Sequence, residues 1–158
     1  MLVDFVHHRS SSGCRPFFKH FQYGDVMNKQ IFVNLPVKDL DKSKAFFSAL
    51  GYSFNPQFTN DKGAGMVIAE GSIYAMLLTE PFFKTFIDKP IVQAKEATEV
   101  LVCLSCESRE EVDSLVAKAV AAGGRAPRPA QDHGFMYAHA FEDLDGHIWE
   151  LVWMAPQA

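Results

Sequence analysis

Glu150 is the carboxylate whose position in the sequence best suits it to chemistry. It lies in the run His147–Trp153, in which it is the only acidic residue among apolar neighbours. A carboxyl group held on an apolar wall is suited to accepting and returning a proton. The same residue is equally compatible with a carboxylate that is paired with a nearby Arg or Tyr, or exposed on an open sheet. We therefore take Glu150 as the candidate catalytic residue and keep the paired alternative open.

Two further side chains, Tyr137 and His139, lie two residues apart in the run Phe135–Phe141. Residues at this spacing in a strand share one face. The pattern does not determine whether that face is the one that carries Glu150, so both are candidate ligand-binding residues. His133 lies in the loop before this run, at the expected mouth of a cavity, and is also a candidate. His147 begins its own strand and is expected to form a hydrogen bond there.

Cys103 and Cys106 have the C-x-x-C spacing of redox and metal sites. They fall in Val100–Cys106, which is typical of a strand, and residues three apart in a strand point to opposite faces. We therefore expect two separate, reduced thiols rather than a disulfide or a chelating pair. Cys103 is retained as a candidate wall residue of a ligand pocket.

Composition and charge exclude several classes of protein. The chain has 158 residues and a net charge of −4, without the basic stripe of a nucleic-acid-binding protein. It has no apolar run of the roughly 20 residues that a membrane span requires. No secretion signal is recognisable, which indicates a cytoplasmic protein. Fourteen phenylalanines imply a large aromatic core, an aromatic cavity, or both.

The hydrophobic pattern from Met27 onward predicts two similar units. In the first unit, about residues 30–80, the pattern predicts these elements: a strand at Ile31–Val37, a helix from Asp39 or Asp41 to Leu50, strands at Tyr52–Phe58, Gly65–Ala69 and Ile73–Leu78, and a short helix in Pro81–Asp88. In the second, about residues 98–154, it predicts these: a strand at Glu99–Cys106, a helix opened by the capping box at Ser108, an edge segment at Arg125–Ala130, and strands at Phe135–Phe141 and His147–Trp153.

Residues 1–26 have neither a strand nor a helix period, and we expect them to be a poorly ordered extension of a domain that spans 27–158. The two units of that domain have matching segments, in the same order. Gly71–Leu78 aligns with Gly146–Trp153, and Val33–Asp39 aligns with Val102–Glu107. The sequence thus predicts an α+β fold of two β-α-β-β-β modules that form a curved mixed sheet cleft, with the helices outside.

Two motifs resemble the vicinal oxygen chelate superfamily, which includes glyoxalase I, bleomycin- and fosfomycin-resistance proteins and extradiol dioxygenases. They are Leu35-Pro-Val-Lys-Asp-Leu-Asp41, with the Leu50-Gly51-Tyr52 that follows it, and Phe141-Glu-Asp-Leu-Asp-Gly-His-Ile-Trp-Glu-Leu151. Gly134-Phe-Met-Tyr137, together with Asp145-Gly-His-Ile-Trp-Glu150, is similar to a bacterial branch labelled predicted lactoylglutathione lyase. The resemblance covers about residues 28–154.

The resemblance implies a divalent metal on the concave sheet face, held by the first and last strands of each module. The corresponding positions here are Phe32, Ala75, Leu101 and Glu150. Only Glu150 offers a metal ligand, whereas a catalytic metal normally has three protein ligands. We therefore predict no metal site and no cofactor, and keep a bound divalent metal as the alternative.

Strand alternation, combined with the resemblance, gives a predicted cavity wall. If Glu150 faces the cavity, then Phe32, Asn34, Leu77, Leu101 and Cys103 are expected to face it too. This wall is apolar with a few polar groups, as small-molecule pockets are.

We predict a protein that binds a small apolar or aromatic ligand in the sheet cleft and has largely lost the family's metal site. The alternative is a glyoxalase-like lyase or isomerase with Glu150 as the general base, so enzymatic activity stays open. A module whose groove binds another protein is a third hypothesis. Because these folds commonly pair, the expected partners are a small molecule and a second copy of the chain in a homodimer.

Overall fold

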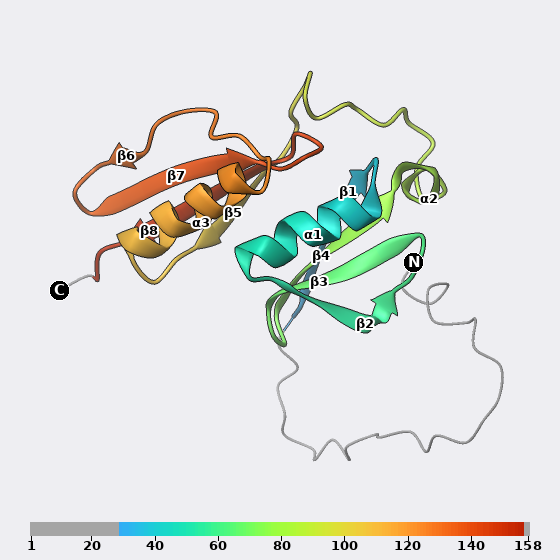
Figure 1. Ribbon diagram of the computed structural model, residues 1–158, viewed down its shortest axis with the longest axis horizontal. Helices are drawn as coiled ribbons and strands as arrows, with labels where there is room; N and C mark the ends of the chain where they lie inside the picture. The colour runs from blue at the N-terminus through green and yellow to red at the C-terminus, as the bar shows by residue number, and fades with distance from the viewer. Residues whose placement is uncertain (1–28, 157–158) are drawn as a thin grey trace, which may run out of the picture.

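The computed structural model of the protein describes residues 29–156, so the predicted N-terminal extension lies outside the described residues. Within these residues the chain forms eight strands and three helices, which Figure 1 labels. The first module contains β1 (Ile31–Val37), α1 (Leu40–Leu50), β2 (Ser53–Thr59), β3 (Gly63–Ala69), β4 (Ile73–Thr79) and the short α2 (Glu80–Lys84). The second contains β5 (Leu101–Ser105), α3 (Arg109–Ala121), β6 (Gln131–Asp132), β7 (Met136–Glu142) and β8 (Ile148–Met154).

The two modules have the same strand topology. The first sheet has the order β1-β4-β3-β2 and the second the order β5-β8-β7-β6. In each sheet the first strand runs parallel to the last one, and the remaining neighbours are antiparallel. The predicted α+β fold with two β-α-β-β-β modules is confirmed. The strands of residues 29–156 form two four-stranded mixed sheets and no closed barrel.

Helices α1 and α3 begin and end where the sequence predicts, whereas the short α2 begins one residue before the predicted segment Pro81–Asp88 and ends at Lys84. Asp39 is the N-cap of α1, since its side chain accepts a hydrogen bond from the backbone N–H of Lys42, and Gly51 ends the helix with φ +105°. Ser108 is the N-cap of α3 and accepts a hydrogen bond from the N–H of Glu111. The Glu111 carboxylate in turn accepts from the N–H of Glu107, as in a capping box shifted by one residue. These local signals fix where α1 and α3 begin and where α1 ends.

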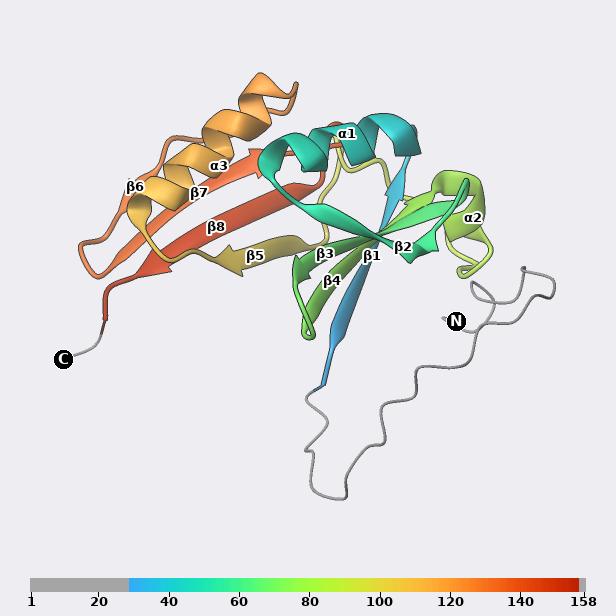
Figure 2. The same cartoon turned by 60° about the horizontal axis from the view of Figure 1, so that its bottom comes forward.

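Helices α1 and α3 lie on the same side of the two sheets and next to each other (Figures 1 and 2). One hydrophobic core therefore extends through both modules. At its centre Phe47 of α1 packs edge-on against Phe46 and against Trp149 of β8, with ring centroids 5.0 and 5.2 Å apart. Trp149 stacks in turn on Phe141 of β7. The core accounts for only part of the aromatic content, because other rings lie on the helix-free side.

The turn between β7 and β8 joins the two modules through hydrogen bonds. The buried Asp143 carboxylate accepts from the N–H groups of the next turn and from the Trp149 indole. Asp145 accepts from the backbone N–H of Lys38 and from the Ser43 hydroxyl of the first module. His147 Nε2 lies 2.8 Å from the carbonyl oxygen of Pro36, so the hydrogen bond expected at His147 is present. The turn holds the end of β1 against the start of β8.

None of the helices in residues 29–156 has the length and apolar character that crossing a bilayer requires.

Candidate functional site

Each sheet has one face covered by α1 or α3, and we call the opposite face the open face. On the first sheet this opposite face is partly covered, since Met76 and Leu78 on it are buried. On the second sheet, the open face carries these residues of β5 and β8: Leu101, Cys103, Ser105, Ile148, Glu150 and Val152. Their alternates, Val102, Leu104, Trp149 and Leu151, belong to the core or pack against it. The faces predicted for these two strands are confirmed. The part of the open face that β5 and β8 form is apolar apart from Glu150, Cys103 and Ser105.

Glu150 lies in the middle of this open face, between Cys103 of β5 and Ala140 of β7. Its carboxylate forms an ion pair with the guanidinium of Arg128. The Glu150 side chain is 25% exposed and that of Arg128 is 51% exposed. The structure therefore corresponds to the alternative kept open above, a carboxylate with an arginine partner.

Arg128 is the site residue that the sequence did not single out. It lies between Pro127 and Pro129, in the segment that leads to β6. Proline restricts φ and excludes the residue before it from the helical region, so this segment stays extended. An arginine placed between two prolines beside an edge strand is the signal that could have identified it. The pairing itself spans 22 residues and is set by tertiary structure.

Cys103 lies beside Glu150 in the register of β5 and β8. Burial raises the pKa of the Cys103 thiol, and the neighbouring Glu150 charge raises it further. The pKa of Cys106, which packs against the core, is raised to about 11, mainly by burial. Both thiols are free and point to opposite sides of the sheet, as predicted. At neutral pH the protonated thiol is favoured, so Cys103 is a wall residue rather than an activated nucleophile.

The prediction that Leu77 faces the cleft is wrong. Leu77 and Ala75 are fully buried in the core on the helix side of the first sheet. The parallel register pairs Phe32 with Tyr74, so these two residues share the open face, where their rings stack with centroids 4.9 Å apart. Asn34 is also on this face, opposite Met76.

The cause of this error is a shift of one residue between the two modules. Superposing the core residues Val33 and Val102 brings Met76, not Ala75, onto Glu150. The sequence match between the last strands therefore differs by one residue from their structural equivalence. A shift of one position in a strand moves every side chain to the other face.

Tyr137 and His139 lie on the helix side of β7, away from Glu150, so the interpretation that places them with Glu150 is wrong. The register of β7 and β8 puts Ala138 and Ala140 on the open face instead. The Tyr137 hydroxyl donates to Asp113 of α3 at 2.8 Å, and His139 Nδ1 lies 3.8 Å from the same carboxylate. Arg109 of α3 covers the Tyr137 ring. These contacts hold α3 on the sheet.

His133 lies in the exposed turn between β6 and β7. Its backbone N–H donates to the carbonyl of Met136 at 2.8 Å. The adjacent Asp132 forms an ion pair with Arg109, which lowers the pKa of that carboxyl. The loop is thus attached to α3, and no contact joins the His133 side chain to Glu150.

The donor set of the open faces does not fit the metal that the resemblance implies. With the corrected register, the four equivalent positions are Phe32, Met76, Leu101 and Glu150. They provide one carboxylate and one weakly coordinating thioether. No group of three or more His, Cys, Asp or Glu side chains in residues 29–156 is placed to hold a metal ion.

A cavity of about 590 Å³ lies beneath the linker between the modules. Its walls are mainly apolar and come from the end of β1, the starts of β5 and β8, and residues 87–100. None of the predicted site residues lines it. Gly146 allows the linker to pass, because a Cβ there would lie 2.7 Å from the backbone nitrogen of Lys95.

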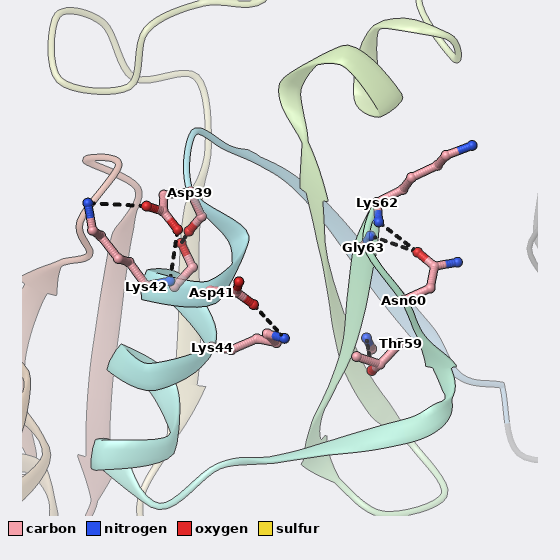
Figure 3. Close-up of polar contacts among 10 residues, drawn as sticks. Asp39, Asp41, Lys42, Lys44, Thr59, Asn60, Lys62 and Gly63 are labelled. Carbon is pink, nitrogen blue, oxygen red and sulfur yellow. Dashed lines mark hydrogen bonds and ion pairs between the residues drawn. The ribbon is translucent and has the colours of Figure 1, made fainter.

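A second hollow, of about 580 Å³, lies between the first turn of α1 and the β2–β3 turn (Figure 3). Part of the charge in this hollow is paired. Lys42 contacts Asp39 at 3.1 Å and Lys44 contacts Asp41 at 2.8 Å. Asn60 accepts from the backbone N–H groups of its own turn. These contacts belong to the start of α1 and to the β2–β3 turn.

The fold has counterparts among known proteins. A family model described as bleomycin resistance protein-like N-terminal matches residues 29–69. The structure of hypothetical protein SA1046 from S. aureus is 33% identical, with a TM-score of 0.67, and the match covers 81% of this chain and 95% of that one. A glyoxalase/bleomycin resistance protein/dioxygenase family enzyme from Burkholderia phytofirmans is 16% identical (TM-score 0.64, 78% and 97% covered).

The fosfomycin resistance protein FosX from Listeria monocytogenes is 20% identical, with a TM-score of 0.60 and 82% and 96% of the chains covered. At such identities the likeness concerns the fold. The search of curated proteins gave no match.

Proposed function

Since the chain belongs to the glyoxalase/bleomycin-resistance/dioxygenase family of the vicinal oxygen chelate superfamily, we propose that it binds a small apolar or aromatic molecule on its open sheet faces. The observation that carries the proposal is the make-up of the open face around Glu150. Apolar side chains of β5 and β8 surround the Arg128–Glu150 ion pair there. Ligand sites are typically lined in this way, by apolar groups with a few placed polar ones.

We further propose that binding does not depend on the metal of the superfamily. The support is the chemistry of Phe32, Met76, Leu101 and Glu150, which together lack the three ligands of a catalytic centre. Metal analysis of the purified protein tests this. We expect no stoichiometric Ni, Zn, Mn or Fe, and one such ion bound per chain would contradict the proposal.

A second candidate is a glyoxalase-like lyase or isomerase with Glu150 as the general base. The Arg128–Glu150 pair favours this candidate in one respect, because the guanidinium is a donor that could stabilise an enolate oxygen next to the base. Glu150 would first have to be released from Arg128. The test is turnover of the hemithioacetal of methylglyoxal and glutathione. Turnover that is lost in Glu150→Gln while ligand binding persists would support the enzyme, and no turnover by the wild-type protein would exclude this reaction.

We also propose that the chain forms a homodimer. Large apolar side chains are exposed near the starts of β1 and β5, among them Ile31 (55% exposed) and Val100 (59%). Apolar side chains gathered at the surface are often covered by a second subunit. Gel filtration with light scattering should give about twice the chain mass of 17.7 kDa, and a single-chain mass would contradict the dimer.

A further inference from the structure

Two arginines reach from one segment to the glutamates of the second open face. Residues 125–132 run along β7, with a backbone bridge between Arg125 and Glu142 and the short strand β6 paired to Ala138 and Tyr137. Arg125 forms an ion pair with Glu142, and Arg128 forms one with Glu150. Glu142 and Glu150 share a face, because Ala140, two residues before Glu142, is the register partner of Glu150.

The two pairs differ in how much of the guanidinium they use. Arg125 is held by both carboxylate oxygens of Glu142, through Nε at 3.0 Å and through Nη2 at 2.6 and 2.8 Å. Arg128 is held through Nη2 alone, by one oxygen of Glu150, and makes no other hydrogen bond within residues 29–156. A guanidinium has five N–H donors, so Arg128 keeps most of its hydrogen-bonding capacity.

The Arg128 side chain is also restrained, both at its backbone and at its guanidinium. Pro127 and Pro129 restrict the backbone on either side of it, and Glu150 holds its tip from a central position in the sheet. A side chain fixed in this way loses less conformational entropy when a ligand binds. Its half-exposed guanidinium remains accessible to a ligand on the face of Leu101, Ile148 and Val152.

We propose that Arg128 binds the anionic end, a carboxylate or a phosphonate, of the ligand whose apolar part lies on this open face, and that Glu150 is a positioning residue for Arg128. The inference rests on the proposed ligand-binding function and names the class of ligand. An anion adds to the unused donors of Arg128 without breaking the ion pair, and an oxyanion with two oxygens fits the fork of the guanidinium. A cation would have to displace Arg128 from Glu150.

The experiment compares three probes with the same ring and different charges: benzoate, benzyl alcohol and benzylamine. Their dissociation constants are measured by calorimetry on the full chain and its variants. For the wild-type protein we expect benzoate to bind roughly tenfold or more tightly than either other probe. Arg128→Gln should remove this preference and leave the affinity for benzyl alcohol unchanged. Arg125→Gln is the matched control, since the Arg125 guanidinium is already held by both carboxylate oxygens of Glu142, and it should keep the preference.

The role of Glu150 has its own readout. Removing a negative charge beside an anion site would by itself tighten benzoate binding. If Glu150 positions Arg128, Glu150→Ala should instead weaken benzoate binding. Glu150→Gln, which keeps an acceptor oxygen for Arg128, should restore the affinity for benzoate. Thermal melts verify that each variant is folded. If Arg128→Gln is not folded, Arg128→Met, which also removes the charge and keeps an unbranched side chain, replaces it.

The outcomes separate the inference from the function on which it rests. Equal affinity for all three probes, a preference for benzylamine, or an equal loss in Arg125→Gln would overturn the anion site and leave the proposed binding function intact. Tighter benzoate binding by Glu150→Ala would overturn the positioning role. If no probe binds at millimolar concentration, the proposed function fails and the inference fails with it.

Discussion

Glu150 and Cys103 show how a single neighbour changes the chemistry of a residue. Both lie on the open face that strand alternation predicts for β5 and β8. The arginine that pairs with Glu150 and the burial that raises the Cys103 pKa are properties of the assembled sheet. The residue types therefore limited the possible chemistry, whereas the neighbours decide which group is engaged.

The coupling between these two residues is directly testable. Because the Glu150 charge raises the pKa of Cys103, Glu150→Gln should increase the thiolate fraction at pH 8 and speed alkylation of Cys103 by iodoacetamide. The rate is measured by mass spectrometry of the peptide that contains Cys103. Glu142→Gln is the control and should leave the rate unchanged. A rate in Glu150→Gln equal to that of the wild-type protein would show that the charge does not reach the thiol.

At the scale of elements, the helices were easier to predict than the faces of the strands. The caps of α1 and α3 are local signals, and both are present in the structure. The edge segment Arg125–Ala130 forms only one isolated bridge, and the regular pairing begins at β6. Two prolines remove the N–H donors that a longer strand would need.

The β7–β8 turn and the linker meet at Gly146, which gives a prediction with a built-in control. Gly146 and Gly71 both have positive φ, +96° and +77°, so alanine is strained at both positions. Only at Gly146 would the new Cβ meet backbone, at Lys95 and Ala94. Chemical denaturation should show that Gly146→Ala loses more stability than Gly71→Ala, by about 1 kcal/mol or more, because overpacking adds to the strain. Equal losses would mean that the linker moves aside freely.

At the scale of the whole molecule, the two modules share one core and one set of polar contacts. Phe46 and Phe47 of the first module pack with Phe141 and Trp149 of the second. The Asp145 and His147 contacts with the first module join the same two halves. A domain with a continuous core is expected to unfold as a unit.

Truncating the Phe47 side chain tests whether the two modules unfold together. Phe47 is 1% exposed, so Phe47→Ala should destabilise the protein by roughly 3–5 kcal/mol. Tryptophan fluorescence reports on β8 alone, because both tryptophans lie there, and far-UV circular dichroism reports on both modules. The two transitions should coincide in the wild-type protein and in Phe47→Ala. Separate midpoints would show that the modules unfold independently.

The sequence by itself determined the two-module α+β fold, the boundaries of α1 and α3, and the faces of β1, β5 and β8. These features depend on hydrophobic periods and caps that operate within one segment. Tertiary structure alone decided the faces of β4 and β7, since a shift of one residue in pairing reverses every side chain of a strand. It also decided that Arg128 reaches Glu150, because that contact depends on how an edge segment lies along the sheet and not on any local pattern.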